Sequence, residues 1–313
     1  MLNGKTLGVV VPAYQEEGLI ATTIAGIPGY VDRIIVVDDA SSDETRARAE
    51  AVDDPRVEVI VHERNQGVGA AIVTGYKRAV EERIEVTVVM AGDNQMDPGE
   101  LEHIARPVLL GEVDYAKANR LITGRAWEII PRNRYLGNAV LSLLTKIASG
   151  YWHVADSQAG YAAISLGTLE QLDLDRVYTR YGFPNDLLVH LNVINARVRD
   201  VPSRPIYNVG ERSGIRIRSV VPRISWLLLK GFFWRMREKY VIRDFHPLVF
   251  FYLFGIVATL VGLGLGIAET VLRILGHGIP TATIVLVALL LIAGSQFTLF
   301  AMWFDMESNK DLR

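Results

Sequence analysis

Two long uncharged stretches near the C-terminus constrain this chain more than any other feature. Residues 245–267 contain only His246 and Thr259 as notable polar side chains, and residues 281–304 carry no charge. At about 1.5 Å of rise per residue, each stretch forms a helix long enough to cross a bilayer core of about 30 Å. Buried helices of soluble proteins are the alternative, but they are rarely so uniformly apolar over this length. The short connector between the stretches predicts a two-helix transmembrane hairpin.

Basic residues dominate the segment that precedes this hairpin. Between residues 212 and 243, Glu238 is the only acidic residue that opposes a run of arginines and lysines. Positively charged loops stay on the cytoplasmic side of a membrane. We therefore expect a multi-pass protein of the cell membrane, with its N-terminal domain and both chain ends in the cytoplasm. In residues 219–240, aromatic and basic side chains alternate, which favours amphipathic helices in the headgroup layer over a helix packed on a protein core.

The first part of the chain, up to about residue 211, has a different pattern. Short apolar runs alternate there with helical stretches, and the runs are TLGVVVPAY, RIIVVDD, RVEVIVHE and VTVVM. This alternation predicts an α/β domain with a mostly parallel sheet and helices on both faces. We expect Ser41 or Ser42 to cap the helix after the second run, and Asp97 to cap the helix that begins near Pro98.

Polar residues gather where three of these strands end. The first strand ends in PAYQEE, the second in DDASSDE and the fourth in AGDNQMD. A single aspartate at such a place is usually a turn former or a helix cap. In parallel sheets, however, ligands bind beyond the carboxyl ends of the strands. Three acidic clusters at one edge of the sheet therefore predict a binding site.

Several classes of protein are disfavoured by composition and spacing. The formal net charge of -2 argues against a generally basic nucleic-acid binder, so we expect no nucleic-acid partner. The absence of cysteine excludes disulfides, thiolate metal sites and cysteine nucleophiles. The loop NQGVGAA has Ile72 where a dinucleotide-binding loop has its third glycine, and it follows the third strand, not the first.

Six motifs follow one another in a specific order: VVPAYQEE, VVDDASSDET, NQGVGAA, GDNQMDP, AKANRL and DSQAGY. Together they resemble the family 2 glycosyltransferases of the GT-A (Rossmann-like) fold, in particular the polyprenyl-phosphate glycosyltransferases of the dolichol-phosphate mannose synthase type. The resemblance covers roughly residues 6–218. Together with the hydropathy and charge patterns above, it predicts a cytoplasmic catalytic domain (1–211), a basic loop with juxtamembrane amphipathic helices (212–244), two transmembrane helices (245–304) and a cytoplasmic tail (305–313).

The resemblance also implies roles for individual residues. Those on the donor side are Pro12, Tyr14, Glu16, Asp39, Gly67, Asp93 and Arg216. Those that hold the acceptor phosphate are Arg120, Arg132, Arg134 and Ser213. Asp93 and Gln95 would bind Mg²⁺ or Mn²⁺, which prefer oxygen ligands. The catalytic set comprises Asp93, Asp156, Arg120, Arg132 and Arg134.

Two features leave alternatives open. The family commonly has two aspartates in an Asp-x-Asp motif after the fourth strand, and Ala91 stands in the first of these positions, which removes a carboxylate from the expected metal site. The arginines could instead form a solvated basic face that attracts lipid headgroups. A non-catalytic membrane module that binds nucleotide sugars, or a transferase with a saccharide acceptor, therefore remains an alternative.

The predicted function is that of a membrane-anchored inverting glycosyltransferase. It would move a sugar from a nucleotide-diphosphate donor, such as GDP-mannose, a UDP-hexose or UDP-N-acetylglucosamine, to a dolichyl- or undecaprenyl-type polyprenyl phosphate. A phosphate monoester has its second pKa near 6 and is mostly a dianion at neutral pH, so it needs no strong general base. The two-helix anchor could also support a homo-oligomer.

Overall fold

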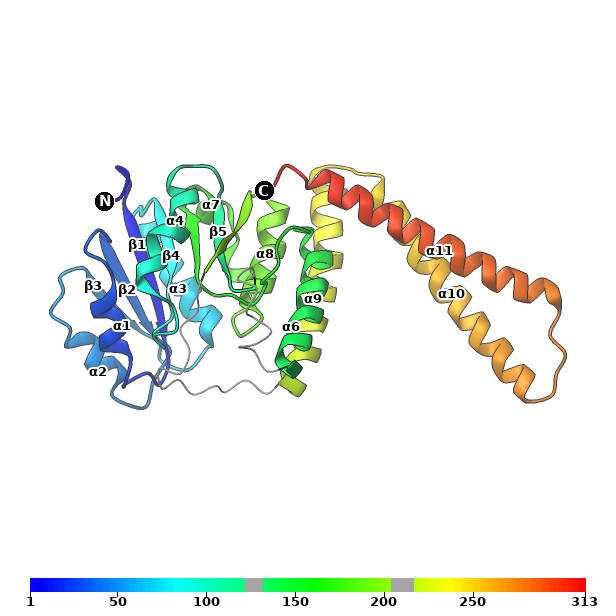
Figure 1. Cartoon of the computed structure of the whole chain (residues 1–313), viewed down its shortest axis with the longest axis horizontal. Helices are drawn as coiled ribbons and strands as arrows, with labels where there is room; N and C mark the ends of the chain where they lie inside the picture. The colour runs from blue at the N-terminus through cyan, green and yellow to red at the C-terminus, as the bar shows by residue number, and fades with distance from the viewer. Residues whose placement is uncertain (122–131, 204–216) are drawn as a thin grey trace. The chain divides into compact units, whose positions relative to one another are not determined.

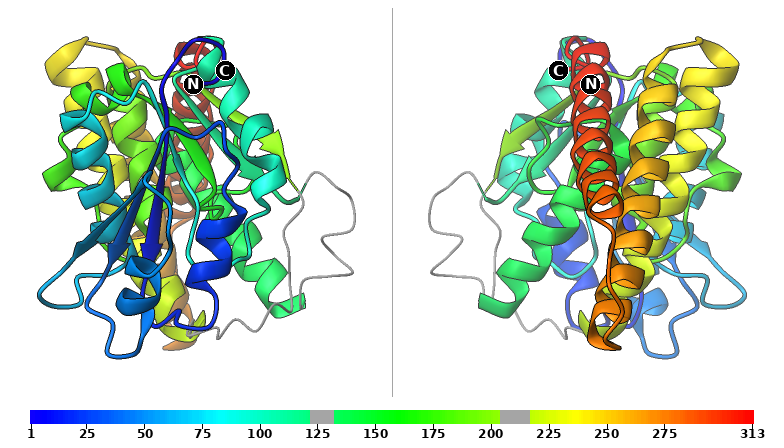
Figure 2. Two further views of the ribbon diagram at one scale, coloured as in Figure 1. Left: turned by 90° about the vertical axis from the view of Figure 1, so that its left-hand side faces the viewer. Right: turned by 90° about the vertical axis from the view of Figure 1, so that its right-hand side faces the viewer.

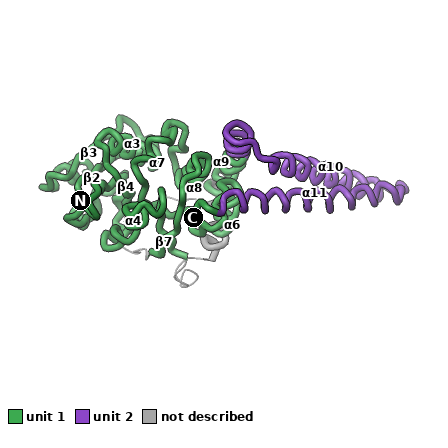
Figure 3. The backbone as a smooth tube through the Cα atoms, turned by 90° about the horizontal axis from the view of Figure 1, so that it is seen from above, with its two compact units in different colours: residues 1–232, 311–313 green, residues 233–310 purple. Residues whose placement is uncertain are grey.

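A computed structural model describes residues 1–121, 132–203 and 217–313 of the chain (Figure 1). These residues form two compact units, the first made of Met1–Phe232 with Asp311–Arg313, and the second of Phe233–Lys310 (Figure 3). The predicted catalytic segment, 1–211, lies within the first unit.

The first unit contains a seven-stranded sheet in the order β3-β2-β1-β4-β6-β5-β7. Its strands are β1 (Leu7–Ala13), β2 (Arg33–Asp38), β3 (Val57–Val61), β4 (Val86–Val89), β5 (Tyr115–Asn119), β6 (Ala162–Ser165) and β7 (Val198–Pro202). Strand β6 runs antiparallel to both of its neighbours, and every other pairing is parallel. The predicted mostly parallel sheet is thus confirmed, whereas the reversed strand was not foreseen.

Helices cover both faces of this sheet, as predicted (Figures 1 and 2). The longer ones are α3 (Val68–Glu81), α4 (Leu101–Leu109), α6 (Arg132–Ser149) and α8 (Phe183–Val193), and a further helix, α9 (Ile217–Arg237), continues from the first unit into the second. The shorter ones are α1 (Ile20–Gly26), α2 (Thr45–Glu50), η1 (Pro98–Glu100), α7 (Leu166–Gln171) and η2 (Leu174–Arg176).

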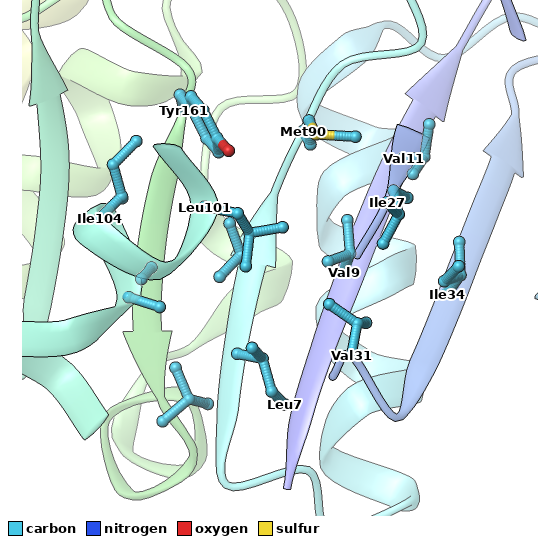
Figure 4. Packing of buried hydrophobic residues seen from close by; sticks show 14 of the residues in the cluster. Leu7, Val9, Val11, Ile27, Val31, Ile34, Met90, Leu101, Ile104 and Tyr161 are labelled. Atoms are coloured by element: carbon cyan, nitrogen blue, oxygen red, sulfur yellow. The ribbon is translucent and has the colours of Figure 1, made fainter. Parts of the chain in front are cut away.

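The alternation of side chains along the strands produces two separate cores. Val9 and Val11 of β1 join α1 and α4 in one core, whose packing is drawn in Figure 4. Val10, between them, faces α3, α7 and α8 in the other. All three valines are fully buried, because strands covered by helices on both faces expose neither side to water. Gly75 of α3 is required here, since a Cβ at this position would collide with the side chain of Val10.

The second unit consists mainly of α10 (Leu248–Ile274) and α11 (Thr281–Ser308), preceded by the π-helical segment η3 (Glu238–Arg243). Both helices are long and apolar enough to cross a membrane. In the most apolar 18-residue stretch of each helix, only 22% (α10) and 11% (α11) is buried. Core helices of a soluble protein would be mostly covered, so this exposure points to a membrane protein. Gly255 of α10 packs against Thr298 of α11, and small residues at such a contact let two helices approach closely.

Candidate functional site

The loops after β1, β2 and β4 meet at one edge of the sheet, as the sequence predicted. Asp39 donates its backbone N–H to the carbonyl of Ala13 at 2.9 Å, and Gly92 donates to the carbonyl of Pro12 at 3.1 Å. The hydroxyl oxygen of Ser41 accepts a hydrogen bond from the backbone of the first loop. Because β1 lies between β2 and β4, the ends of all three strands are neighbours.

The two predicted helix caps in this region have different outcomes. Asp97 accepts a hydrogen bond from the backbone N–H of Gly99 at 2.8 Å and caps η1, which confirms its predicted role. The prediction for Ser41 or Ser42 is wrong, because α2 begins only at Thr45. Ser41 instead donates its hydroxyl to the carboxylate of Asp38, which fixes the turn after β2.

Acidic side chains surround the turn that follows β4. Asp93 accepts the backbone N–H of Gln95 at 3.1 Å, and Asn94 between them has a left-handed backbone with φ of 55°. Burial, followed by the charges of Asp93 and Asp43, raises the pKa of Glu16 to about 7. A divalent cation would relieve this accumulation of negative charge.

The described residues contain no group of three or more His, Cys, Asp or Glu side chains that could hold a metal ion. A cation at this turn would therefore be held by Asp93 and Gln95 together with ligand phosphate oxygens and water. Magnesium commonly binds in this way, through one or two carboxylates plus substrate phosphates. The residues present fit such a weakly held ion, in keeping with the alanine at position 91.

Asp39 holds the loop that precedes α3. Its carboxylate accepts hydrogen bonds from the backbone N–H groups of Gln66 at 2.8 Å and Gly67 at 2.7 Å, and it lies 2.8 Å from Nδ1 of His62. Gly67 has a positive φ of 101°, and a Cβ there would collide with the carbonyl of Thr179. Backbone geometry and packing thus account for this glycine. Donor contacts by Asp39 and Gly67 stay predictions.

The remaining predicted donor residues lie at the end of β1 and beyond the described segments. Pro12 is buried within the strand, whereas Tyr14 is 45% exposed and available to a ligand at the strand end. Arg216 lies outside the described residues, as does Ser213 on the acceptor side.

The acceptor side of the site is built on β5 and the loop that enters β6. Because β6 is antiparallel, its first residues lie at the same edge as the last residues of β5. Asp156 in this loop is only 3% exposed. Its carboxylate accepts two bonds from the guanidinium of Arg120, from Nε at 2.7 Å and from an Nη at 3.0 Å. Asp156 therefore orients Arg120.

Burial raises the pKa of Asp156, but the hydrogen bonds and charge of Arg120, with the charge of Lys117, outweigh it and bring the pKa below its ordinary value. The carboxylate is consequently ionised at neutral pH. Arg132 and Arg134 begin α6. Their side chains fall outside what the structure describes, and their phosphate-binding roles stay predictions.

The segments predicted to form the donor and acceptor sides are in contact with each other. The hydroxyl of Tyr161 donates to the backbone carbonyl of Asp97 at 2.9 Å. A Cβ at Gly160 would lie 3.5 Å from the methyl carbon of Met96. The DSQAGY motif thus packs against the turn that carries Asp93, which brings the two predicted halves of the site together.

Sequence reasoning missed two charged residues behind Arg120. Lys117 of β5 is fully buried, and Asp200 of β7 lies beside it in the register of the two strands. A lysine flanked by alanines in a predicted buried strand was a visible signal, because a buried ammonium group requires a partner. The partner could not be identified from the sequence, since Asp200 is 83 residues away.

Comparison with known proteins identifies the family. The sequence model of glycosyl transferase family 2 matches residues 8–172. This is more than half of the chain, which therefore belongs to that family, as predicted. The chain is 28% identical over 218 residues to a UDP-N-acetylglucosamine–dolichyl-phosphate N-acetylglucosaminyltransferase of Methanococcus voltae, covering 65% of this chain and 86% of the relative.

Two further similarities are informative. The chain is 29% identical over 198 residues to an undecaprenyl-phosphate mannosyltransferase of Micrococcus luteus, covering 62% of this chain and 80% of the relative. Among solved structures, glucosyl-3-phosphoglycerate synthase of Mycobacterium tuberculosis, in complex with Mn²⁺, UDP and glucosyl-3-phosphoglycerate, matches with a TM-score of 0.54. At 22% identity over 74% of this chain and 80% of that one, this match shows the shared fold. The protein is thus a glycosyltransferase of family 2, and the two relatives described above are named as transferases that use a dolichyl or undecaprenyl phosphate.

Proposed function

We propose that this protein is a membrane-anchored inverting glycosyltransferase that moves a sugar from a nucleotide-diphosphate donor to a polyprenyl phosphate. The observation that carries the proposal is the bidentate pair between Arg120 and Asp156, packed against the turn that carries Asp93. In this arrangement, an oriented arginine side chain suited to the acceptor phosphate would lie near acidic side chains suited to a metal cation. The two named relatives transfer different sugars to polyprenyl phosphates, and both support this acceptor class.

The acceptor phosphate requires orientation more than activation. A phosphate monoester is mostly a dianion at neutral pH and can attack without a strong general base. Arg120 would hold it through charge-assisted hydrogen bonds, and Asp156 fixes the direction in which the guanidinium points. Attack by a phosphate oxygen on the sugar C1, opposite the departing nucleotide, would invert the anomeric centre.

The donor side must offset the charge of the leaving diphosphate. We propose that Asp93 and Gln95 hold Mg²⁺ or Mn²⁺ there, which would supply positive charge to the diphosphate. Tyr14, exposed at the end of β1, would contact the nucleoside. The α10–α11 hairpin would anchor the enzyme in the bilayer that holds the lipid acceptor, with the catalytic domain and both termini in the cytoplasm.

The test is a panel of labelled nucleotide sugars, which includes GDP-mannose, UDP-glucose and UDP-N-acetylglucosamine. Each is incubated with undecaprenyl or dolichyl phosphate, with and without Mn²⁺, and scored for lipid-extractable label. Asp93→Ala should abolish incorporation, whereas the control Asp53→Ala, at an exposed aspartate between α2 and β3, should leave it unchanged. Full activity of Asp93→Ala would contradict the metal assignment. Donor binding without transfer to any lipid would favour a non-catalytic module, and label in a saccharide product would indicate a different acceptor.

A further inference from the structure

Lys117 is a fully buried cation on β5, beneath the candidate phosphate site. Its ammonium group donates to the backbone carbonyl of Asp156. It also donates to the carbonyl of Ala118 and to Oδ1 of Asp200, each at 3.4 Å. An ammonium group is taken out of water at a large free-energy cost unless it is paired and hydrogen-bonded. These contacts provide the pairing, and they attach Lys117 to the residue that orients Arg120.

The carboxylate of Asp200 contacts three residues around the Arg120–Asp156 pair, namely Lys117, Asn119 and Ala155. It stands opposite Lys117 in the parallel register of β5 and β7. While Oδ1 faces Lys117, Oδ2 accepts the side-chain amide of Asn119 at 2.6 Å and the backbone N–H of Ala155 at 2.7 Å. Asn119 and Ala155 each directly precede a member of the Arg120–Asp156 pair. The single carboxylate of Asp200 therefore holds the side chain of Asn119 and the backbone of Ala155, the residues that precede the two members of the pair.

The charges of this group balance. Lys117 and Arg120 are cations, and Asp156 and Asp200 are anions. When a phosphate dianion approaches Arg120, it competes with Asp156 for the same guanidinium. The charge of Arg120 and then that of Lys117 lower the pKa of Asp156, which would favour its ionised form while Arg120 shares its hydrogen bonds with a phosphate. Without Lys117, less positive charge would offset the repulsion between Asp156 and the incoming phosphate.

We propose that Lys117 and Asp200 are positioning residues for acceptor binding, which hold Asp156 in place so that Arg120 is presented to the phosphate of the lipid. This inference rests on the proposed function and names residues for its acceptor side. It separates Lys117, which is fully buried, and Asp200, whose side chain is 9% exposed, from the neighbouring Arg199, whose side chain is 42% exposed and pairs with Glu112.

The kinetic test uses Lys117→Met and Asp200→Asn, with Arg199→Gln on the same strand as the matched control. The KM for polyprenyl phosphate should rise about 10- to 100-fold in both variants, by analogy with the loss seen when outer-shell partners of metal ligands are removed. The KM for the nucleotide sugar should stay unchanged, because the donor side keeps its contacts. Equal rises in both KM values, or an unchanged acceptor KM, would overturn the proposal.

The double variant Lys117→Met/Asp200→Asn separates positioning from stability. Removing both members of a buried ion pair relieves the uncompensated charge that either single change leaves behind. The double variant should therefore fold more stably than Lys117→Met and yet keep the raised acceptor KM, because Asp156 still lacks its second cation. Recovery of the acceptor KM together with stability would show that the pair is merely structural.

A third measurement, the chemical modification of Arg120, does not require sugar transfer. Phenylglyoxal modifies arginine side chains, and peptide mass mapping gives the rate at Arg120. The rate should increase severalfold in Lys117→Met and Asp200→Asn relative to wild type, and remain unchanged in Arg199→Gln. Wild-type protein that yields no lipid-linked sugar with any donor would refute the proposed function, and unchanged labelling of Arg120 would refute the positioning role.

Discussion

Replacing Asp305 should destabilise the second unit strongly. Asp305 lies near the end of α11, and its carboxylate pairs with the guanidinium of Arg235 at 2.8 and 2.9 Å. The hydroxyl of Tyr240 donates to the same carboxylate at 2.7 Å, and the side-chain amide of Asn309 donates at 3.1 Å. Asp305 and Arg235 are both fully buried. The change Asp305→Ala leaves the arginine without this counter-charge.

The magnitude follows from this burial. Removing one member of a buried ion pair costs about 3–5 kcal/mol, because the remaining charge is left uncompensated. Tyr240 also loses the acceptor for its hydroxyl proton, although its oxygen still accepts from Asn309, and an unsatisfied buried donor costs about 1–3 kcal/mol. The two contributions overlap, so we expect Asp305→Ala to lower the free energy of unfolding by about 4 kcal/mol. Asp305→Asn retains one acceptor oxygen and should lie nearer 3 kcal/mol.

Unfolding by SDS titration in mixed micelles measures this free energy. Arg243→Gln is the control, because Arg243 forms a 3.3 Å ion pair with Glu238 and is 51% exposed. Exposed pairs contribute about 0–1 kcal/mol, so the control should change little. The double variant Arg235→Met/Asp305→Leu should recover much of the lost stability. A loss below about 1 kcal/mol in Asp305→Ala would refute the reasoning, because a buried arginine would then tolerate the loss of its partner.

Three further predictions concern the first unit, and urea or thermal unfolding checks each of them. Gly75→Ala should lower the free energy of unfolding by about 1–3 kcal/mol, because the added Cβ would collide with Val10. The control is Gly167→Ala in α7, where a Cβ meets nothing within 4 Å, and it should be neutral or slightly stabilising. Equal effects of the two changes would contradict this explanation. Tyr161→Phe removes the hydroxyl bond to the loop before η1 and should cost about 1 kcal/mol, so no measurable loss would argue against that bond. Burial lowers the pKa of His153 below its usual 6.5, so its neutral form contributes stability above pH 6.5 that is lost as the pH falls. His153→Gln should therefore lose less stability than wild type between about pH 6.5 and pH 5, and identical pH profiles would contradict this.

Local patterns in the sequence were sufficient for the elements of the fold. Apolar runs such as VVVPA predicted buried strands, since covered strands are apolar on both faces. The position of Asp97 before proline predicted its cap, because a cap depends on residues within one turn. The uncharged stretches predicted both apolar helices from length and composition alone. The order of six motifs predicted the family, and the strand-end clusters predicted which edge carries the candidate site.

Contacts between distant segments required the tertiary structure. The reversal of β6 brings Asp156 to Arg120, and the register of β5 and β7 places Asp200 beside Lys117. Neither arrangement has a local signal, because a strand of either direction shows the same alternation. The burial of Arg235 was likewise not evident, since the sequence placed it in a basic segment at the membrane surface, whereas its partner lies 70 residues away. Sequence periodicity thus determines which elements form and which faces are apolar. The pairing of charges between elements is decided only when the chain packs, because it depends on the register and direction of segments far apart in the sequence.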